Sequence, residues 1–579
     1  MFMGRRFFST WRTLHEMQVE SCKKYADRNV FGRRQMDGTF NWVTYSRFER
    51  DVDRFRSLLS SFGVSKGDRV AVIGSNSYEW AVCAYGVYGR GGLLVPMYPD
   101  QRKEESDYII ADSGASVLVL ESQEKYQAYR REGLKLVYYD DMFSCEDESP
   151  AVELVEDDGA CLIYTSGTTG QPKGVLLTHK NLSSNVQAVS QVLGDKLNKE
   201  SVSLSFLTWA HVFGQVMELH QLISVGGSTA AISPKTIIAD LQTVKPTVLV
   251  GVPAIYARVY EGIRSKIQSG SGIQKHLFEL AMKVAAERQV FFDKDGGRGW
   301  RPLLWLKWNL ADYLVFSKVK QVMGGRLRFC ATGGSKCSAE VQEFFDMIGV
   351  PLLEGYGATE TSPVLIMERY GPTEHTQGGL RPIPGVSIRI CDESGNELPH
   401  GKPGEICAAG PNIMQGYWNK PEATKAVFFG EYFRTGDSGI VTIDPLNAGK
   451  VITILGRVRD TFKLANGKYV NPLHVENRAL NSGYCAQVCL LGVDKDQTTL
   501  VVYPTQEGFE LLEKKQFVSE LNHLFVEQVE KHFEIPSTYV ILDQVMNVDN
   551  GMLTPKLSVK RHVVREYVDR NPQLTKLEK

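Results

Sequence analysis

The chain has 579 residues, of which 43% are hydrophobic and 23% charged, and its formal net charge is −1. This is the composition of a globular protein large enough for several cores, and at about 150 residues per folding unit the length predicts roughly three or four units. The balanced charge argues against nucleic acid as a partner and provides no overall field toward an anionic membrane. The ten cysteines are scattered without a Cys-x-x-Cys pair, which predicts reduced thiols rather than a metal site or a disulfide framework.

The N-terminal segment, residues 1–14, is basic. It contains Arg5, Arg6 and Arg12 together with Ser and Thr, and no acid occurs before Glu16. This composition is typical of a short mitochondrial targeting leader, but a disordered tail or a weak membrane-surface anchor has it too. We therefore expect a mitochondrial protein, with a cytoplasmic or peripheral membrane location as the alternative. No run of about 18 uninterrupted apolar residues occurs, so no transmembrane span is predicted.

Strands alternate with helices through the first half of the chain. Residues 69–74 form an apolar, β-branched run of the kind found in buried parallel strands, and a helix is predicted over 75–88. Similar strand runs occupy 116–120 and 247–252, and 338–348 predicts a further helix. This alternation predicts an α/β fold with a doubly wound sheet, in which ligands bind at the carboxyl ends of the strands.

The pattern changes in the second half. Residues 382–454 contain short strand patterns with frequent Gly, Pro, Asn and Asp turns, which predicts a β-rich subdomain. A domain boundary is expected near Gly456. We therefore predict a large N-terminal domain over 15–456 and a small, mobile α+β C-terminal domain over 457–579, with a helix from 512 to 533.

A loop rich in glycine and hydroxyl side chains follows the apolar run before Tyr164. Residues 164–174 have the sequence Tyr-Thr-Ser-Gly-Thr-Thr-Gly-Gln-Pro-Lys-Gly. Its backbone amides can surround phosphate oxygens, the hydroxyls add donors, and Lys173 adds a mobile positive charge. It is not a Walker loop, because Pro172 stands where that pattern requires a glycine after Gly167. The loop predicts a phosphate site, with a Ser/Thr/Gly surface linker as the alternative.

This loop resembles the phosphate-binding signature of the acyl-adenylate-forming (AMP-binding) superfamily. Further motifs follow in the order typical of that superfamily, at residues 209–213, 333–334, 354–363, 434–437 and 456–463. Together they span most of the chain, which makes a chance resemblance very improbable. The resemblance implies ATP, Mg²⁺ and coenzyme A as ligands, with coenzyme A as a co-substrate.

The resemblance also implies roles for single residues. Glu360 would hold Mg²⁺, a hard cation that accepts few protein ligands, and Thr359 would bond the α-phosphate. His211 would line the acyl entrance, and Arg459 and Asp460 would form the hinge of the C-terminal domain. The residues implied for nucleotide binding are Thr165, Ser166, Gly167, Thr168, Thr169, Gly170, Lys173, Gly333, Gly334, Tyr356, Asp437, Arg457 and Lys463.

Several of these residues have simpler interpretations when taken alone. His211 fits a structural histidine on an apolar segment, Tyr356 a buried tyrosine in a strand-end turn, and Asp437 a turn aspartate. The acyl pocket also departs from the superfamily pattern. Thr208 and Trp209 replace the more usual Pro-Leu, and a glutamine, residue 215, stands where some members carry an aromatic gate.

The catalytic lysine of the superfamily has no direct counterpart. Long-chain enzymes typically carry it two residues before a Lys-Arg pair, and here Ser558 holds that position before Lys560 and Arg561. Lys556 and Lys560 flank Ser558, each two residues away, and in an extended loop such positions face the same side. Both stay candidates, with Lys556 favoured because Lys560 and Arg561 match the trailing pair.

Residues 275–325 and 462–470 resemble the long-chain fatty acyl-CoA synthetases within the superfamily. We therefore expect an ATP-dependent long-chain fatty acid–CoA ligase that forms acyl-AMP and then acyl-CoA, releasing AMP and pyrophosphate. The alternatives are an adenylating enzyme for a medium-chain or other acid or for another acceptor, and a non-catalytic lipid- or nucleotide-binding pseudoenzyme. The expected ligands are fatty acid, ATP and coenzyme A; peripheral membrane contact is a further expectation, and the oligomeric state stays open.

Overall fold

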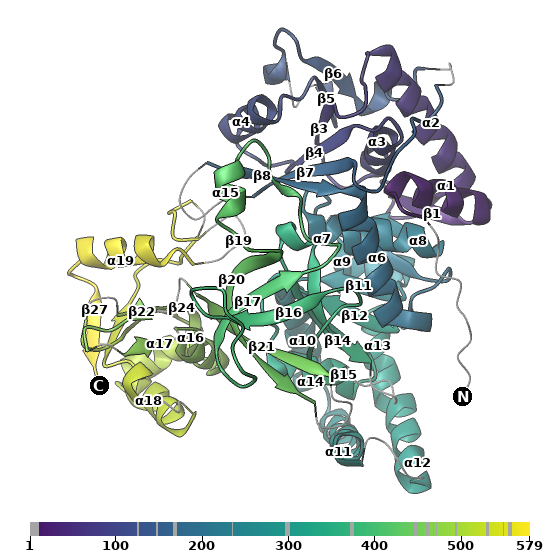
Figure 1. Ribbon diagram of the computed structural model, residues 1–579. Helices are drawn as coiled ribbons and strands as arrows, with labels where there is room; N and C mark the ends of the chain where they lie inside the picture. Colours follow the sequence, from purple (N-terminus) through teal and green to yellow (C-terminus); the bar gives the residue numbers. More distant parts are fainter. Residues whose placement is uncertain are drawn as a thin grey trace. The chain divides into compact units, whose positions relative to one another are not determined.

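The computed structural model describes residues 11–123, 127–145, 149–165, 171–233, 235–295, 301–370, 376–444, 449–458, 462–466, 468–470, 472–492, 495–528, 532–547, 549–553 and 559–579. The chain forms two compact units (Figure 1). Unit 1 contains Met1–Ile388, Ala408–Phe433 and Ile443–Ile452, and unit 2 contains Arg389–Cys407, Arg434–Thr442 and Thr453–Lys579.

The first sheet of unit 1 is parallel through most of its width. Its strand order is β18-β8-β7-β4-β3-β5-β6, and the pairs that join β4, β3, β5 and β6 are parallel whereas β7 and β8 are antiparallel. The strands are β3 (Arg69–Ile73), β4 (Leu93–Met97), β5 (Val117–Leu120), β6 (Lys135–Tyr138), β7 (Gly159–Thr165), β8 (Lys173–Thr178) and β18 (Gly416–Tyr417).

The second sheet of unit 1 has a parallel centre. Neighbouring strands follow the order β15-β14-β13-β12-β11-β9-β10-β1-β2, parallel from β13 to β1. They are β1 (Asn29–Arg34), β2 (Phe40–Thr44), β9 (Val202–Ser205), β10 (Ser228–Ala231), β11 (Val248–Gly251), β12 (Phe329–Thr332), β13 (Leu352–Gly357), β14 (Val364–Tyr370) and β15 (Thr376–Pro382).

Helices cover these sheets because their apolar faces need burial. Helices α1 (Leu14–Lys24), α2 (Tyr45–Ser61) and α3 (Tyr78–Gly89) pack on one another, and α3 contacts β3 and β4 (Figure 1). The other long helices of unit 1 are α4 (Lys103–Ser113), α6 (His179–Leu193), α9 (Ile237–Val244), α10 (Pro253–Gln268), α11 (Gly272–Asp295), α12 (Pro302–Ala311) and α14 (Ala339–Met347). The predicted α/β class with parallel sheets is confirmed.

Unit 2 joins a β-rich part to a small α+β part. Strands β16 (Ser387–Cys391), β17 (Gly404–Ala409), β20 (Tyr432–Ile443) and β21 (Lys450–Arg457) are neighbours in that order, and a four-stranded sheet has the order β24-β25-β26-β27. Those four strands are Cys485–Leu491, Thr499–Pro504, Thr538–Ile541 and Thr575–Glu578, and the helices are α16 (Pro472–Asn481), α17 (Gln506–Glu513), α18 (Phe517–Gln528) and α19 (Arg561–Arg570).

One predicted helix is wrong. The segment 512–533 contains the end of α17, then α18, and a short 3₁₀ turn at His532–Glu534. The break falls at Lys515, whose φ is +58°. That left-handed conformation cannot continue a right-handed helix, so α17 ends before it and α18 starts anew.

The N-terminus of the described chain belongs to the folded core. Trp11 and Leu14 are 4% and 0% exposed, and the Thr13 side chain caps α1 in a reciprocal capping box with Glu16. Ser183 Oγ on α6 donates to the Arg12 carbonyl at 2.9 Å. A removable leader compatible with this packing is therefore confined to the residues before Trp11.

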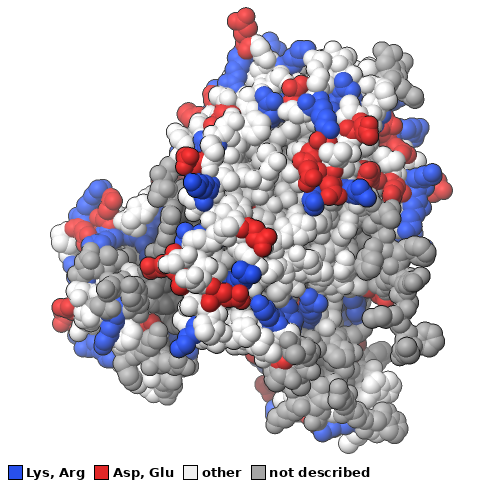
Figure 2. All heavy atoms as spheres, in the orientation of Figure 1, with Lys and Arg blue, Asp and Glu red and all other residues white. Residues whose placement is uncertain are grey.

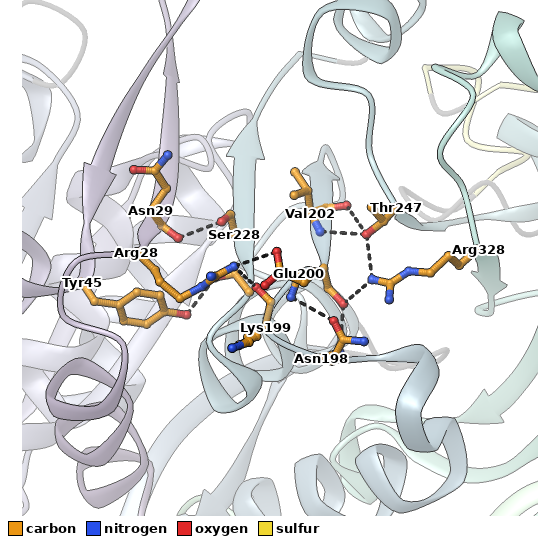
Figure 3. A network of polar contacts seen from close by, with 12 residues as sticks. Arg28, Asn29, Tyr45, Asn198, Lys199, Glu200, Val202, Ser228, Thr247 and Arg328 are labelled. Carbon is orange, nitrogen blue, oxygen red and sulfur yellow. Dashed lines mark hydrogen bonds and ion pairs between the residues drawn. The ribbon is translucent and has the colours of Figure 1, made fainter.

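A polar network joins the starts of the strands in the second sheet (Figure 3). Ser228 Oγ donates to the Asn29 carbonyl at 2.7 Å, and Thr247 Oγ1 accepts from the Val202 amide at 2.9 Å. Arg328 Nη2 donates to Thr247 Oγ1 at 3.1 Å. These residues lie at the amino ends of the strands, opposite the edge where an α/β sheet binds ligands, so their role is structural.

All ten cysteines are free thiols, as predicted, and nine of them are buried. On the face drawn in Figure 2, Lys and Arg side chains lie among Asp and Glu side chains, in keeping with the balanced net charge. Within the described part of the chain, no helix is both long enough and apolar enough to cross a bilayer.

Candidate active site

The glycine-rich loop connects two paired strands. Thr165 at the end of β7 pairs with Lys173 at the start of β8, in an antiparallel register. The base of the loop is held from the side, because Tyr164 Oη donates to an Asp112 oxygen at 2.7 Å and Tyr108 Oη donates to the Pro172 carbonyl at 3.1 Å. The predicted phosphate-binding residues 166–170 lie outside the described residues.

Lys173 and Glu360 are brought together through Tyr417. Strand β18 pairs with β8 and so places Tyr417 opposite Val175. The Tyr417 hydroxyl donates to Glu360 Oε1 at 2.9 Å, and Lys173 Nζ lies 5.1 Å from the centre of the Tyr417 ring, within cation–π range. Burial, and then the charge of Glu360, raise the pKa of the Tyr417 phenol, which therefore stays a hydrogen-bond donor at neutral pH.

Glu360 stands on a short 3₁₀ turn, Thr359–Thr361, directly after β13. Thr359 is buried, and the Glu360 carbonyl accepts from the Met414 amide at 2.8 Å. The turn is closely packed, since a Cβ added to Gly357 would lie 1.7 Å from the Pro363 carbonyl oxygen. Only glycine fits there, which explains the glycine of the Glu-Gly-Tyr-Gly motif by close approach of backbone to backbone.

Gly333 and Gly334 follow β12 at its carboxyl end. A Cβ on Gly333 would lie 3.1 Å from the Gly355 carbonyl oxygen and 3.2 Å from the Phe213 ring. Gly334 has a φ of +83°, and a Cβ there would meet nothing within 4 Å. Gly333 therefore allows a close approach of backbone and Phe213, whereas the space at Gly334 is open. Tyr356, on the neighbouring strand β13, is half-buried.

His211 is held at the start of a helical segment. Its Nδ1 accepts from the Phe213 amide at 3.2 Å as the N-cap of a short helix, which continues into a π-helical turn, Gln215–His220. Because Phe213 lies beside Gly333, the segment predicted for the acyl entrance and the glycine pair meet in space. π-helical turns are frequent at functional sites. The predicted gate position, Gln215, is fully buried.

In unit 2, Asp437 and Arg457 form an ion pair with 3.0 Å between Arg457 Nε and Asp437 Oδ1. The Asp437 side chain is 12% exposed and that of Arg457 61%, so the carboxylate is fixed while the guanidinium reaches solvent. Glu405 positions the turn, since it accepts from Arg434 Nη2 at 2.8 Å and from the Gly436 amide at 3.0 Å.

The C-terminal candidates are described only in part. Lys560 is the N-cap of α19 and its amide donates to the Met552 carbonyl at 2.8 Å. Leu553 and Val559 form an isolated antiparallel bridge on either side of residues 554–558. Lys556, Arg459 and Asp460 lie outside the described residues, and of Lys463 only the backbone, paired with Tyr469, is described.

Two residues that contact the site were missed by the sequence analysis. Tyr417 hydrogen-bonds Glu360, the predicted metal ligand, although the two residues are 57 positions apart in the sequence. Glu405 holds the Arg-Thr-Gly-Asp turn through Arg434, which is 29 positions away in the sequence. Neither has a strong local signal, because only the pairing of β18 with β8 and of unit 2 strands brings them into contact. A tyrosine flanked by glycine and tryptophan would have been the one available hint.

Comparison with known proteins bears on what this arrangement does. Residues 19–418 match the family model described as AMP-binding enzyme, and residues 459–570 match the AMP-binding enzyme C-terminal domain. The chain is 27% identical to the peroxisomal long chain acyl-CoA synthetase 7 of Arabidopsis thaliana, over 96% of this chain and 85% of that protein. It is also 27% identical to a chloroplastic long-chain-fatty-acid–[acyl-carrier-protein] ligase of the same plant, over 98% and 87%.

Bacterial proteins are similar to the same extent. A long-chain-fatty-acid–CoA ligase of Mycobacterium bovis is 28% identical, over 93% of this chain and 92% of its own length. Among solved structures, ATP-bound MatB from Rhodopseudomonas palustris has a TM-score of 0.73 at 23% identity, covering 96% of this chain and 99% of that one. At 23% identity, the similarity to MatB shows a shared fold and nothing more.

Proposed function

The chain belongs to the AMP-binding enzyme family, and on that premise we propose that it joins a long-chain fatty acid to coenzyme A at the expense of ATP. The reaction passes through acyl-AMP and releases pyrophosphate and then AMP. The observation that carries the proposal is the cluster of Lys173, Tyr417 and Glu360 between the glycine-rich loop and β13. The long-chain acid is supported by the printed names of relatives that match nearly the whole chain.

The chemistry explains why such a cluster is needed. A carboxylate does not react with a thiol at neutral pH, since oxide would have to leave. Attack of the carboxylate oxygen on the α-phosphate of ATP gives a mixed anhydride and expels pyrophosphate. Most of the barrier to this transfer lies in positioning and charge neutralisation. The protein must therefore hold the phosphates, a metal ion and the ribose in a fixed geometry.

The described residues fit Mg²⁺. Within the described part of the chain, no group of three or more His, Cys, Asp and Glu forms a metal cage. Mg²⁺ does not need one, because it is commonly held by one or two carboxylates together with substrate phosphates and water. Tyr417 engages one oxygen of Glu360, and the second oxygen is a ligand of the type that Mg²⁺ prefers. When bound, the metal would neutralise charge on the phosphates.

The other roles are proposed residue by residue. Residues 165–170 and Lys173 bind the phosphates, with Thr359 at the α-phosphate. Gly333 and Gly334 give the adenine room beside Tyr356, in keeping with the open space at Gly334. In unit 2, the buried carboxylate of Asp437 offers two acceptor oxygens suited to vicinal hydroxyls of the ribose, and Arg457 is already paired with it. Lys463 would form a further contact with the nucleotide.

The second half-reaction is proposed to use the C-terminal domain. Arg459 and Asp460 would be the hinge about which it turns between adenylation and thioester formation. A lysine of the 556–560 segment would supply positive charge to the α-phosphate. Lys556 is the first choice, since Lys560 has its backbone tied to Met552 at the start of α19. His211 would line the acyl entrance.

A second acceptor is favoured by one specific observation. One relative is named a long-chain-fatty-acid–[acyl-carrier-protein] ligase and matches 98% of this chain. Pyrophosphate release and product formation should therefore be measured over a panel of fatty acids, with coenzyme A, with an acyl carrier protein and with neither. We expect acyl-CoA from long-chain acids. Acyl transfer only to the carrier protein would favour the second acceptor. Absence of pyrophosphate release with every acid would favour the non-catalytic binding protein.

The matched inactive variant is Glu360→Gln. It keeps the size of the side chain and the hydrogen bond to Tyr417 but replaces the anionic metal ligand by a neutral one, so adenylation should be abolished with the fold intact. Normal pyrophosphate release by the folded variant would contradict the metal assignment.

We also propose mitochondrial targeting, on the basicity of the N-terminal segment. The buried Trp11 and the cap at Thr13 limit any processing site to the residues before them. A fluorescent fusion that carries residues 1–14 tests this. Diffuse fluorescence in the cytosol would contradict it.

A further inference from the structure

Helix α12 and the π-helical turn η5 (Asp312–Phe316) that continues it present apolar side chains to solvent. Leu303, Leu306, Leu310 and Tyr313 are 65%, 59%, 57% and 76% exposed. They are spaced three, four and three residues apart, so they lie on one face of the helix. Soluble proteins rarely expose a contiguous apolar stripe of this kind. Where one occurs, it marks an interaction site.

Core packing does not account for this stripe. Leu304, Ala311 and Phe316 occupy the opposite face and are at most 8% exposed, and Ala311 and Phe316 belong to the same core cluster as residues of α14. The segment is therefore apolar on both faces. A helix that is apolar all round is normally covered on all sides, by protein or by lipid.

Helix α11 packs on α12 (Figure 1) but does not cover the stripe, whose residues are at least 57% exposed. Arg288 on α11 lies 4.1 Å over the Trp308 ring, and Arg301 lies 4.6 Å over the ring of Phe291. Beside these contacts, α11 adds to the exposed apolar area with Leu277 and Leu280, which are 40% and 44% exposed. We call residues 272–291 and 301–326 the α11–α12 surface.

The α11–α12 surface is strongly basic, although the chain as a whole is neutral. Its two segments contain eight Lys and Arg against three Asp and Glu, whereas the whole chain has 66 against 67. Two of the acids are already paired, Glu287 with Lys307 and Asp312 with Lys320. Balanced composition therefore conceals a local basic surface around the apolar stripe.

This combination identifies the occupant. A second copy of the chain would bring the same basic set against itself across a symmetric interface, which like-charge repulsion opposes. An anionic lipid surface complements it, since Lys and Arg approach the headgroup phosphates while the leucines enter the acyl boundary. Trp305, 68% exposed, and Tyr313 are of the two residue types enriched at membrane–water interfaces.

We propose that the α11–α12 surface docks the protein on an anionic bilayer. The stripe of Leu303, Leu306, Leu310 and Tyr313 enters the interface, and exposed lysines such as Lys283 and Lys318 lie at the level of the phosphates. The surface belongs to unit 1 alone. The proposal goes beyond the proposed function and holds whichever acid or acceptor the enzyme uses.

The test is co-sedimentation of the full chain with vesicles of phosphatidylcholine alone and of phosphatidylcholine with phosphatidylserine at about two to one. The apolar variant is Leu306→Gln/Leu310→Gln/Tyr313→Ser. Its matched control, Met36→Gln/Val155→Gln/Ile238→Gln, replaces three exposed apolar residues elsewhere in unit 1, at 106%, 57% and 66% exposure. The charge variant is Lys283→Glu/Lys318→Glu, with Lys402→Glu/Lys425→Glu, also exposed, as control.

The wild type should prefer anionic vesicles. The apolar variant should partition at least about tenfold more weakly, as expected from removing partly inserted leucines. The charge variant should lose about tenfold at low salt and less at high salt, where charges are screened. Both controls should bind like the wild type. Every altered residue is exposed, so the unfolding midpoint of each variant should match that of the wild type, and pyrophosphate release with a water-soluble acid should be unchanged.

Three results would overturn the proposal. The first is wild-type binding of anionic vesicles by the folded apolar variant. The second is equal loss in the apolar variant and its control. The third is a concentration-dependent dimer of the wild type, seen by sedimentation velocity, that the apolar variant abolishes while vesicle binding stays the same. Failure of the proposed function, by contrast, would appear as absent pyrophosphate release with vesicle binding intact.

Discussion

Replacing Tyr417 by phenylalanine isolates one contact of the candidate active site. The hydroxyl donates to Glu360 Oε1 at 2.9 Å, while the ring lies 5.1 Å from Lys173 Nζ. Phenylalanine keeps the ring and its cation–π contact but removes the donor. Glu360 then loses the bond that fixes its side chain toward the metal position, whereas Lys173 is unaffected.

The structure sets the size of the effect. A hydrogen bond to a charged group contributes about 1.5–3 kcal/mol, which corresponds to roughly 10- to 150-fold in rate. Tyr417 is half-buried, so water can replace part of the lost bond, and we expect the lower end of that range. Adenylation should fall about tenfold, the Mg²⁺ concentration for half-maximal rate should rise, and KM for ATP should change little.

Exchange of labelled pyrophosphate into ATP, titrated with Mg²⁺, measures this directly. The control is Tyr432→Phe on β20, since the Tyr432 hydroxyl bonds Ser387 Oγ at 3.1 Å. Wild-type exchange by Tyr417→Phe at every Mg²⁺ concentration would refute the positioning role. An equal loss in the control would show that any buried hydroxyl has the same effect.

The remaining predictions concern the C-terminal residues and a buried acid. Lys556→Ala should slow acyl-AMP formation at least about 100-fold and affect thioester formation from supplied acyl-AMP much less, because a serine at 558 supplies no charge to the α-phosphate. The same loss in Lys560→Ala would assign the role to Lys560 instead. No loss in either variant would exclude the segment from catalysis. Arg459→Pro should impair thioester formation more than adenylation, because it fixes φ at the proposed hinge, and equal loss in both half-reactions would contradict a hinge. Burial raises the pKa of Glu368 from 4.5 to about 7, so between these pH values the folded protein keeps a proton that the unfolded chain releases. The free energy of unfolding therefore falls by up to about 3 kcal/mol as the pH rises through this range. Glu368→Gln should remove this fall in urea unfolding at pH 5 and 8, whereas Glu343→Gln, at an exposed position on α14, should keep it.

Local patterns predicted the parts of the fold whose signals are local. The strand at 69–74 appears as β3 (Arg69–Ile73), and the helix at 338–348 as α14, which the Ser338 side chain caps at its start. A β-branched run and an N-cap act within a few residues, so one sequence contains the whole signal. The helix predicted over 512–533 failed for the opposite reason, since nothing local indicates the left-handed Lys515.

The candidate site divides in the same way. Glu360, Lys173 and the glycines are found by their motifs, but the partners that hold them are not. Tyr417 reaches Glu360 because a two-residue strand adds to the edge of β8, and Glu405 reaches the Asp437 turn from a neighbouring strand. Such contacts depend on sheet order, which composition and periodicity do not specify.

The α11–α12 surface shows why a net charge can mislead. The composition predicted no field toward an anionic membrane, and for the chain as a whole that follows from 66 basic and 67 acidic residues. The two segments that carry the apolar stripe hold eight bases and three acids, so their charge differs in sign and size from the average of the chain. On α12 the inner face, with Leu304 and Ala311, is already buried, and Ala311 belongs to the core cluster. The leucines of the outer face contribute nothing to that packing, and their exposure to water is a cost to the isolated protein. A bilayer removes that cost, and it is also where a long-chain acid partitions. If both proposals hold, the same segment that resembles the long-chain branch in sequence carries, on its outer face, a means of bringing the enzyme to the proposed substrate.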